Sequence, residues 1–291
     1  MDREDRIKIF KETVGIVLSN GYRNKKGEEV SIPRKVDGLS IDNVTFYDYD
    51  ARKEVEFDKL RKCKTKITVV NQDCLYAAKE LIDQGYHPAV INNASFAKPG
   101  GGVRTGSAAQ EENLCRRTNL FESIFRFDDY LSKEYGITND TDKHYPLEMN
   151  YGAIYSPSIT VFREGEDKNY ELLEEPFNLD IITIAAIKRP ELLPGRKLNA
   201  GAKEIFKRKV EQMLNLALAW GNDSVVLGAF GCGAYGTPPE EMANIFKEVI
   251  SSTDYYDKFE RIVFAILDDG NSHKEHNPNG NFKPFNEIIL S

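Results

Sequence analysis

The chain has 291 residues, of which 41% are hydrophobic and 29% charged, so it is long enough to bury a full core. Its formal net charge of −7 argues against broad electrostatic capture of a polyanion, because nucleic-acid-binding proteins usually carry a basic surface. We therefore expect no direct nucleic-acid binding. If the ligand carries phosphates, local backbone N–H groups must hold them.

The cysteines and histidines show no pattern of a metal site or of a disulfide framework. The four cysteines, together with the lack of a secretory leader, predict reduced thiols in a cytoplasmic protein. No apolar run approaches the roughly 20 residues needed to cross a bilayer, so no membrane partner is expected. We predict no metal, no cofactor and no histidine-based catalysis. The residues concerned are Cys63, Cys74, Cys115, Cys232, His87, His144, His273 and His276.

The N-terminal part predicts a helical scaffold. Within residues 2–19, apolar side chains recur at helical spacing, and Asn20-Gly21 ends that helix. The polar segment 23–34 predicts a loop or a short ribbon. We assign residues 1–60 to an N-terminal helical extension packed on a core of residues 61–291, in one domain overall, because no linker divides the chain. The apolar stripe consists of Ile7, Phe10, Val14 and Leu18.

From about Asn43 onward, strand and helix patterns alternate. Continuous apolar strands without alternation are typical of a sheet covered by helices on both faces, so the pattern predicts an α/β/α domain. Segments 163–178 and 188–200 predict loops. The predicted strands are 44–47, 67–71, 89–93, 154–162, 181–185, 225–229 and 262–267, and the predicted helices are 74–81, 107–131, 202–220, 239–252 and a short one near 285–290.

The strongest chemical signal is Gly100-Gly101-Gly102, which is followed after seven residues by Gln110-Glu111-Glu112. Consecutive glycines allow positive φ angles and a backbone pressed against a ligand. Adjacent glutamates in a helix point about 100° apart. One would therefore face the glycine loop, and the other would have a supporting or orienting role. The alternative is a pair of solvated residues in a first helical turn, which the helix dipole favours.

A second glycine-rich stretch, residues 228–236, lies between a predicted strand and a predicted helix. Such a loop can direct backbone N–H groups at a diphosphate without a lysine. It contains the pattern G-x-G-x-x-G at 231–236, which would also suit a nicotinamide-cofactor oxidoreductase. No βαβ unit follows with an acidic residue at the usual distance of about 20 residues, so that alternative rests on this match alone.

The GGG-x7-QEE arrangement is preceded by Asn92-Asn93-Ala-Ser and followed by Leu-Cys-Arg-Arg-Thr-Asn-Leu. It closely resembles the bacterial-type poly(ADP-ribose) glycohydrolases, and the resemblance runs from roughly Arg6 to the C-terminus. It implies a macrodomain-like three-layer α/β/α sandwich with a mixed central sheet. The implied activity is hydrolysis of ribose–ribose O-glycosidic bonds in poly(ADP-ribose), with ADP-ribose and poly(ADP-ribosyl)ated proteins as partners.

The resemblance also implies roles for individual residues. Glu112 is the catalytic acid and then the base for water, while Glu111 contacts ribose hydroxyls. Tyr235, where relatives carry phenylalanine, packs against the distal ribose. Asp73 stands where many macrodomains bind adenine, although it is equally the natural N-cap of the following helix. The expected substrate-binding set is Asp73, Asn93, Gly100, Gly101, Gly102, Val103, Gln110, Gly231, Cys232, Gly233, Ala234, Tyr235 and Gly236.

Two alternative functions also involve ADP-ribose: a reader that binds it without cleavage, and a hydrolase that acts on mono-ADP-ribosylated protein. The Gln-Glu-Glu triplet argues for an enzyme, because a binder has no need of an ionisable pair at the scissile bond. Cys115 and Cys232 are expected to be buried packing residues. Arg116 and Arg117 are expected to form ion pairs on a helix surface.

Overall fold

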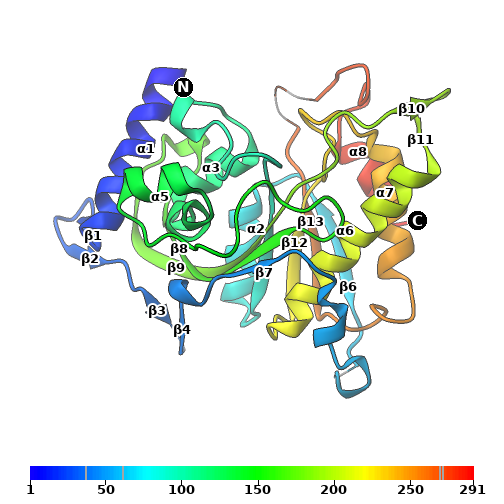
Figure 1. Cartoon of the computed structure of the whole chain (residues 1–291), viewed down its shortest axis with the longest axis horizontal. Coiled ribbons are helices and arrows are strands. Elements are labelled where there is room, and N and C mark those ends of the chain that lie inside the picture. Colours follow the sequence, from blue (N-terminus) through cyan, green and yellow to red (C-terminus); the bar gives the residue numbers. More distant parts are fainter. Residues whose placement is uncertain (37, 61, 269, 271) are drawn as a thin grey trace. The chain divides into compact units, whose positions relative to one another are not determined.

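The computed structural model describes residues 1–36, 38–60, 62–268, 270 and 272–291 (Figure 1). The α-helices are α1 (Arg3–Leu18), α2 (Cys74–Asp83), α3 (Gln110–Arg117), α4 (Leu120–Ile124), α5 (Asp129–Tyr135), α6 (Ala200–Ala219), α7 (Pro239–Ile250) and α8 (Phe282–Ile289). The strands are β1 (Gly21–Arg23), β2 (Glu29–Ser31), β3 (Lys35–Val36), β4 (Leu39–Ser40), β5 (Thr45–Tyr47), β6 (Lys66–Val70), β7 (Pro88–Asn93), β8 (Ala153–Arg163), β9 (Leu172–Ile184), β10 (Leu192–Leu193), β11 (Lys197–Leu198), β12 (Ser224–Leu227) and β13 (Arg261–Ala265).

The main sheet has seven strands in the order β5-β8-β9-β7-β12-β13-β6, and the smaller hairpins lie outside it. This mixed sheet and its helices confirm the predicted α/β sandwich. The chain forms two compact units whose segments interleave along the sequence, so the proposed boundary at residue 60 stays a prediction. Unit 1 consists of Met1–Phe46, Ala94–Leu147 and Ile154–Thr183, and unit 2 of Tyr47–Asn93, Glu148–Ala153 and Ile184–Ser291.

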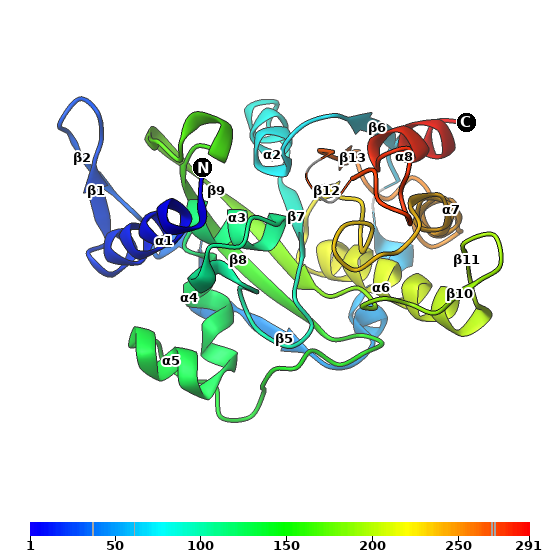
Figure 2. The same ribbon diagram turned by 90° about the horizontal axis from the view of Figure 1, so that it is seen from above.

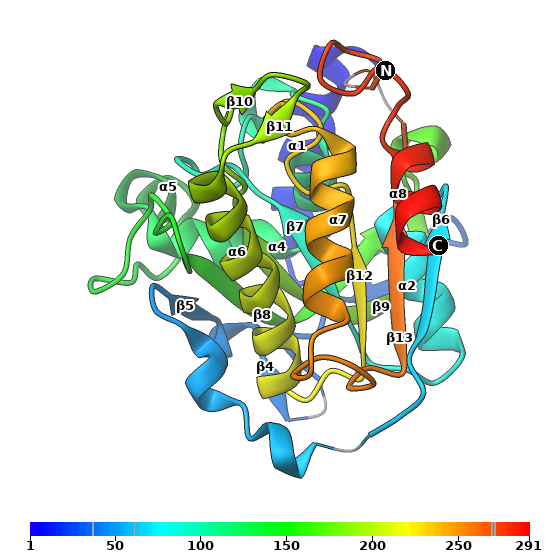
Figure 3. The same ribbon diagram turned by 90° about the vertical axis from the view of Figure 1, so that its right-hand side faces the viewer.

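Unit 2 contains four parallel strands with helices on both of their faces. Val225 of β12 pairs with Ala89 of β7 and with Ile262 of β13, and Ile262 pairs with Ile67 of β6. Helix α2 contacts β7, β12 and β13, whereas α6 contacts β12 and lies beside α7 (Figure 3). Strands β7, β12 and β13 are largely buried and apolar without alternation, which is the pattern of a covered sheet, whereas the edge strand β6 is only partly buried.

In unit 1, helix α1 packs against α3 (Figure 2). The buried face of α1 consists of Phe10, Thr13 and Val17, whereas Leu18 is 63% exposed, so the predicted stripe is wrong at its C-terminal end. Thr13 belongs to the buried face because its hydroxyl donates a hydrogen bond of 2.6 Å to the carbonyl of Arg116. A buried hydroxyl with a partner is tolerated where an unpaired one is costly.

The single helix predicted over 107–131 is wrong, because the chain leaves helical geometry at Thr118. Thr118 is extended, with φ −139° and ψ 173°, and forms a β-bridge with Val161. Its hydroxyl donates to the carbonyl of Leu114 at 2.8 Å and so occupies a group at the end of α3. Helix α5 starts separately, where the carboxylate of Asp128 accepts the N–H groups of Tyr130 and Leu131.

The two predicted loops contain strands. Strand β9 begins at Leu172, so the loop 163–178 is wrong for its last residues. In the run Leu-Leu-Glu-Glu-Pro-Phe-Asn, apolar and polar residues come in pairs, which removes the alternation that marks a strand. The segment 188–200 folds into the hairpin β10–β11 with Gly195 at φ +76°. Among the described residues, no helix has both the length and the apolar composition needed to span a membrane.

Candidate active site

The triple-glycine loop of unit 1 holds the side chains of both glutamates through backbone N–H groups. Gly100 N–H donates to Oε1 of Glu111 at 3.0 Å, and Gly102 N–H donates to Oε1 of Glu112 at 2.7 Å. The other oxygen of Glu111, Oε2, accepts the N–H of Ser95 at 2.7 Å. Two backbone N–H groups thus bind the carboxyl group of Glu111, and one binds that of Glu112. The loop and the first turn of α3 therefore form one rigid arrangement.

The two glutamates differ in how many oxygens the protein occupies. Both side chains are buried, with Glu111 3% and Glu112 7% exposed. Glu111 uses both oxygens to accept backbone N–H groups. In contrast, Oε2 of Glu112 has no hydrogen-bond partner among the described residues. A buried polar atom without a partner is costly and often serves a function, so Glu112 is the glutamate with an oxygen open to a ligand.

Gly101 is the point of closest approach between loop and glutamates. Its φ is +53°, and a Cβ atom there would lie 2.5 Å from Oε1 of Glu112 and 2.9 Å from Oε2 of Glu111. A side chain at this position would strain the backbone and would require the two carboxyl groups to move. The predicted approach of these glycines to a ligand stays a prediction; within the protein, Gly101 approaches the carboxyl groups of Glu111 and Glu112.

Arg116 also holds this part of unit 1, through backbone carbonyls. Its guanidinium is fully buried and donates to the carbonyls of Ser107 (2.8 Å) and Glu112 (3.3 Å). Its guanidinium carbon also lies 5.6 Å from the centre of the Tyr170 ring. Burial lowers the pKa of Arg116, and the nearby Tyr170 and Glu112 act in the opposite direction. The predicted surface ion pairs are wrong, because Arg116 and Arg117 are both buried.

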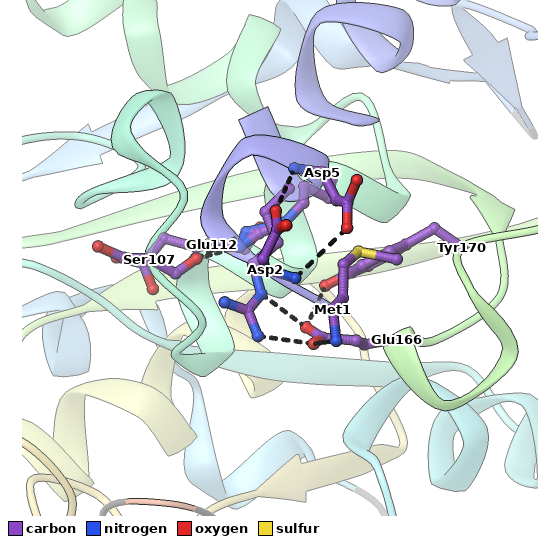
Figure 4. A network of polar contacts seen from close by, with 9 residues as sticks. Met1, Asp2, Asp5, Ser107, Glu112, Glu166 and Tyr170 are labelled. Atoms are coloured by element: carbon purple, nitrogen blue, oxygen red, sulfur yellow. Dashed lines mark hydrogen bonds and ion pairs between the residues drawn. The ribbon is translucent and has the colours of Figure 1, made fainter. Parts of the chain in front are cut away.

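A polar network joins Tyr170 to the N-terminal helix (Figure 4). The Tyr170 hydroxyl donates to Oε2 of Glu166 at 3.2 Å, and Glu166 accepts two hydrogen bonds from Arg6, at 2.7 and 3.0 Å. The hydrogen bond from Arg6 holds the pKa of Glu166 below its usual value although burial opposes this shift. Helix α1 is thereby connected through Tyr170 to the guanidinium that binds the carbonyls of Ser107 and Glu112.

The second glycine loop, in unit 2, keeps several N–H groups available. Its internal bonds include Cys232 N–H to the carbonyl of Ala229 and Thr237 N–H to that of Gly231, both at 3.0 Å. Within the described part of the chain, the N–H groups of Gly231, Gly233 and Ala234 donate to no acceptor. Successive unoccupied N–H groups form an anion-binding concavity, so this loop has the chemistry that a diphosphate requires.

Two positions constrain the shape of this loop. Gly231 has φ +76°, and a Cβ atom there would lie 2.7 Å from Oγ1 of Thr237 and 2.9 Å from the Cβ of Ala186. At Gly228, a Cβ atom would lie 2.9 Å from Nδ2 of Asn93, which ends strand β7. Asn93 therefore lies against the start of the loop, because it ends strand β7 and the loop follows the neighbouring strand β12.

The remaining predicted residues divide between the units. Val103 is buried in unit 1, where Gln110 opens α3. In unit 2, Oδ1 of Asp73 accepts the N–H groups of Leu75 and Tyr76, so Asp73 is the N-cap of α2. Its role toward adenine, and that of Tyr235 toward ribose, stay predictions. Unit 1 thus assembles Gly100, Gly101, Gly102, Val103, Gln110, Glu111 and Glu112, and unit 2 contains Asp73, Asn93, Gly231, Cys232, Gly233, Ala234, Tyr235 and Gly236.

The cysteines of α3 and of the second glycine loop, Cys115 and Cys232, have buried side chains. Cys115 and Cys232 are fully buried, and burial raises the pKa of both thiols well above the usual value. One residue near the second loop was missed: Nε2 of His276 lies 2.9 Å from the carbonyl oxygen of Cys232. No local pattern marks such a contact between distant residues. Among the described residues, no group of three or more His, Cys, Asp or Glu is placed to hold a metal.

Comparison with known proteins agrees with these features. The family described as "Microbial-type PARG, catalytic domain" matches residues 10–164, more than half of the chain, and this range includes both glutamates. No curated protein matches. Among solved structures, poly(ADP-ribose) glycohydrolase from Thermomonospora curvata, bound to the inhibitor ADP-HPD, has a TM-score of 0.75 at 26% identity, covering 97% of this chain and 98% of its own.

The enzyme from Deinococcus radiodurans, solved in complex with ADP-ribose, has a TM-score of 0.66 at 26% identity. That match covers 88% of this chain and 98% of the other. The family match spans the triple-glycine loop and α3, and the structural matches extend over nearly all of the fold. The chain belongs to the microbial-type poly(ADP-ribose) glycohydrolase family.

Proposed function

We propose that this protein is a poly(ADP-ribose) glycohydrolase, which hydrolyses the ribose–ribose O-glycosidic bond and releases ADP-ribose. The observation that carries the proposal is the unequal pair of buried glutamates. Only Glu112 has a carboxylate oxygen without a hydrogen-bond partner among the described residues. Breaking a glycosidic bond requires a proton for the leaving oxygen, and that oxygen of Glu112 is the group available to carry it.

In the first step, the proton on Oε2 of Glu112 moves to the leaving ribose oxygen while the C–O bond breaks and oxocarbenium character develops on the other ribose. The glutamate becomes a carboxylate, which the Gly102 N–H stabilises through Oε1. In the second step, this carboxylate takes a proton from water as the water oxygen bonds to the sugar carbon. Glu112 ends protonated, as it began, so the two steps balance.

Glu111 contributes to this reaction by holding the glycine loop in place. Both of its oxygens hold backbone N–H groups, of Ser95 and of Gly100, so it fixes the start of the glycine loop relative to α3. Each carboxylate oxygen has a second lone pair, which leaves acceptor capacity for the ribose hydroxyls that the family resemblance assigns to it.

In unit 2, the N–H groups of Gly231, Gly233 and Ala234 bind the diphosphate of ADP-ribose in this proposal. Asn93 and Tyr235 contact ribose, and Asp73 contacts adenine while it caps α2. The formal charge of −7 favours such local recognition over general binding of nucleic acid.

The direct test is incubation with an automodified, poly(ADP-ribosyl)ated protein that carries radiolabelled polymer, followed by separation of ADP-ribose, oligomers and protein-bound label. We expect the label to accumulate as free ADP-ribose. A polymer that stays intact while the protein binds it would show a reader instead. Release from mono-ADP-ribosylated protein alone would show a mono-ADP-ribosyl hydrolase.

ADP-ribose alone is expected to raise the melting temperature, because a preformed diphosphate site favours only the folded state. At about 100 times its dissociation constant the ligand adds roughly 2.7 kcal/mol to the free energy of unfolding. For a domain of this size the shift is several degrees, measurable by differential scanning fluorimetry. NADH serves as the matched control, and an equal or larger shift with NADH would favour an oxidoreductase.

We further propose that the protein acts in the cytoplasm. Among the described residues the four cysteines form no disulfide, as is typical of a reducing compartment. Cell fractionation with an antibody to the protein tests this location, and recovery in a secreted or membrane fraction would contradict it.

A further inference from the structure

The carbonyl of Cys232, in the second glycine loop, accepts two hydrogen bonds from one distant segment. Nε2 of His276 lies 2.9 Å and Nδ2 of Asn277 lies 3.1 Å from this oxygen. Because a backbone carbonyl only accepts, Nε2 of His276 must carry its hydrogen here. A carbonyl oxygen has two lone pairs, so these donors fill its capacity.

These two hydrogen bonds to the Cys232 carbonyl fix the direction of the N–H group of Gly233. In a trans peptide the C=O and N–H point in opposite directions. The peptide joining Cys232 to Gly233 has its C=O directed at His276 and Asn277, so the Gly233 N–H is directed away from them. That N–H donates to no acceptor within the described residues. Hydrogen bonds to the carbonyl also polarise the peptide and strengthen its N–H as a donor.

The donor on Asn277 is itself held in one orientation. Asn277 is fully buried, its Nδ2 also donates to Oδ1 of Asn281 at 2.9 Å, and its Oδ1 accepts the N–H of Lys274 at 2.8 Å. Asp268 binds both sides of the segment that contains Asn277. Its Oδ1 accepts the N–H of Asn281 at 2.6 Å and the hydroxyl of Ser272 at 2.9 Å. With both amide groups engaged, a flip of the Asn277 side chain would break several bonds.

The backbone at His276 is anchored by the hairpin β10–β11. The Arg196 guanidinium donates to the carbonyls of Glu275 and His276, both at 3.3 Å. The hairpin is tied in turn to α7, since buried Glu241 accepts the N–H of Leu198 at 3.1 Å and an ion pair from Lys197 at 2.9 Å. Helix α7 directly follows the glycine loop in the sequence. The segment of His276, the hairpin and α7 are therefore joined by hydrogen bonds around the loop.

We propose that His276 and Asn277 are positioning residues for ligand binding, which orient the Gly233 N–H toward the diphosphate of ADP-ribose through the Cys232 carbonyl. The inference rests on the proposed function, in which residues 231–236 bind that diphosphate. Neither side chain touches the ligand. Since the diphosphate is not at the reacting bond, the loop binds the ground state and the transition state alike. Loss of its orientation should therefore raise KM and leave kcat nearly unchanged.

The test compares His276→Ala with the matched control His273→Ala. His273 lies in the same segment, but its ring bonds to the carbonyl of Pro278 and not to the glycine loop. For His276→Ala we expect ADP-ribose affinity to fall about 2- to 10-fold, the effect of one net hydrogen bond, with a parallel rise in KM for polymer hydrolysis. His273→Ala should keep the parental affinity. His276→Gln, which supplies an amide donor, should restore part of the loss.

Affinity is measured by isothermal titration calorimetry with ADP-ribose, and KM and kcat are measured with poly(ADP-ribosyl)ated protein. Equal affinities for His276→Ala and His273→Ala, or a fall in kcat without a rise in KM, would overturn the inference, since a merely structural role predicts such results. If His276→Ala does not fold, His276→Gln against the parent protein decides the question by the same KM-to-kcat comparison. A parent protein that binds ADP-ribose but releases none from the polymer contradicts the proposed hydrolysis, while the affinity comparison still decides the inference.

Discussion

Replacing Glu112 by glutamine is expected to lower kcat for ADP-ribose release about 10⁴-fold, the upper end of what general acid catalysis contributes. That loss corresponds to about 5.4 kcal/mol of transition-state stabilisation, since each 1.36 kcal/mol is tenfold. The amide keeps the volume of the side chain and a carbonyl oxygen for the Gly102 N–H. Its nitrogen occupies the position of Oε2, which has no partner among the described residues, so no hydrogen bond within them is lost and ADP-ribose affinity should hardly change.

Glu111→Gln is the control for this experiment. Both oxygens of Glu111 accept N–H groups, so any orientation of an amide directs one donor against another, at Ser95 or at Gly100. We expect this variant to lose about 1–3 kcal/mol of stability, the cost of leaving a buried donor unpaired. It should lose less kcat than Glu112→Gln and more affinity. Near-parental turnover in Glu112→Gln, measured with labelled polymer, would refute the assignment.

Gly101→Ala is expected to lower kcat about 100-fold, because a displacement of about 1 Å at a catalytic group can cost that much. The new Cβ would lie 2.5 Å from Oε1 of Glu112, at a φ of +53°, so the carboxylate has to move away from the Gly102 N–H. Stability should also fall, since a left-handed conformation costs a non-glycine residue about 1–2 kcal/mol before any clash.

Gly136→Ala separates these two effects. Gly136 has a similar φ of +66°, and no atom lies within 4 Å of the position that its Cβ would take. This control should lose about 1 kcal/mol of stability from backbone strain and keep parental kcat. Urea unfolding curves give the stabilities, and initial rates of polymer hydrolysis give kcat. Equal kcat values for the two variants would show that contact between Gly101 and the carboxylates does not position them.

The sequence predicted the central strands and the helices α2, α6 and α7 because their signals are local. Strand β12 and helix α6 are covered on most sides, so burial forces a continuous or helical apolar pattern into the sequence itself. The glycine loops were equally visible, since Gly101 and Gly231 require positive φ and have no room for a side chain. These features depend on a few neighbouring residues.

Features that depend on distant partners were missed. Thr118 ends α3 because Val161, 43 residues later, bridges to it, and the helical pattern continues through this break. Arg116 and Arg117 follow a helix pattern typical of surface charges, yet their guanidinium groups are buried and donate to the carbonyls of Ser107 and Arg163. His276 lies in a polar segment with no chemical signature until the fold places it beside Cys232.

The motif also left the two glutamates with roles assigned only by resemblance. The geometry distinguishes them, because the N–H groups of Ser95 and Gly100 converge on Glu111, whereas one N–H group, from Gly102, binds Glu112. Such a difference depends on the path of the loop in space. The spacing between Gly102 and Gln110 does not encode it.

The proton-donor role of Glu112 is tested most directly by changing the leaving group. The measurement is the ratio of kcat/KM between parent and Glu112→Gln, taken for poly(ADP-ribose) and for a nitrophenyl glycoside of ADP-ribose. Nitrophenolate leaves without a proton, so it does not need the acid. Our account predicts a ratio of about 10⁴ on the polymer and a ratio at least tenfold smaller on the nitrophenyl substrate. Equal ratios on the two substrates would contradict the account, since they would mean that Glu112 does not protonate the leaving oxygen.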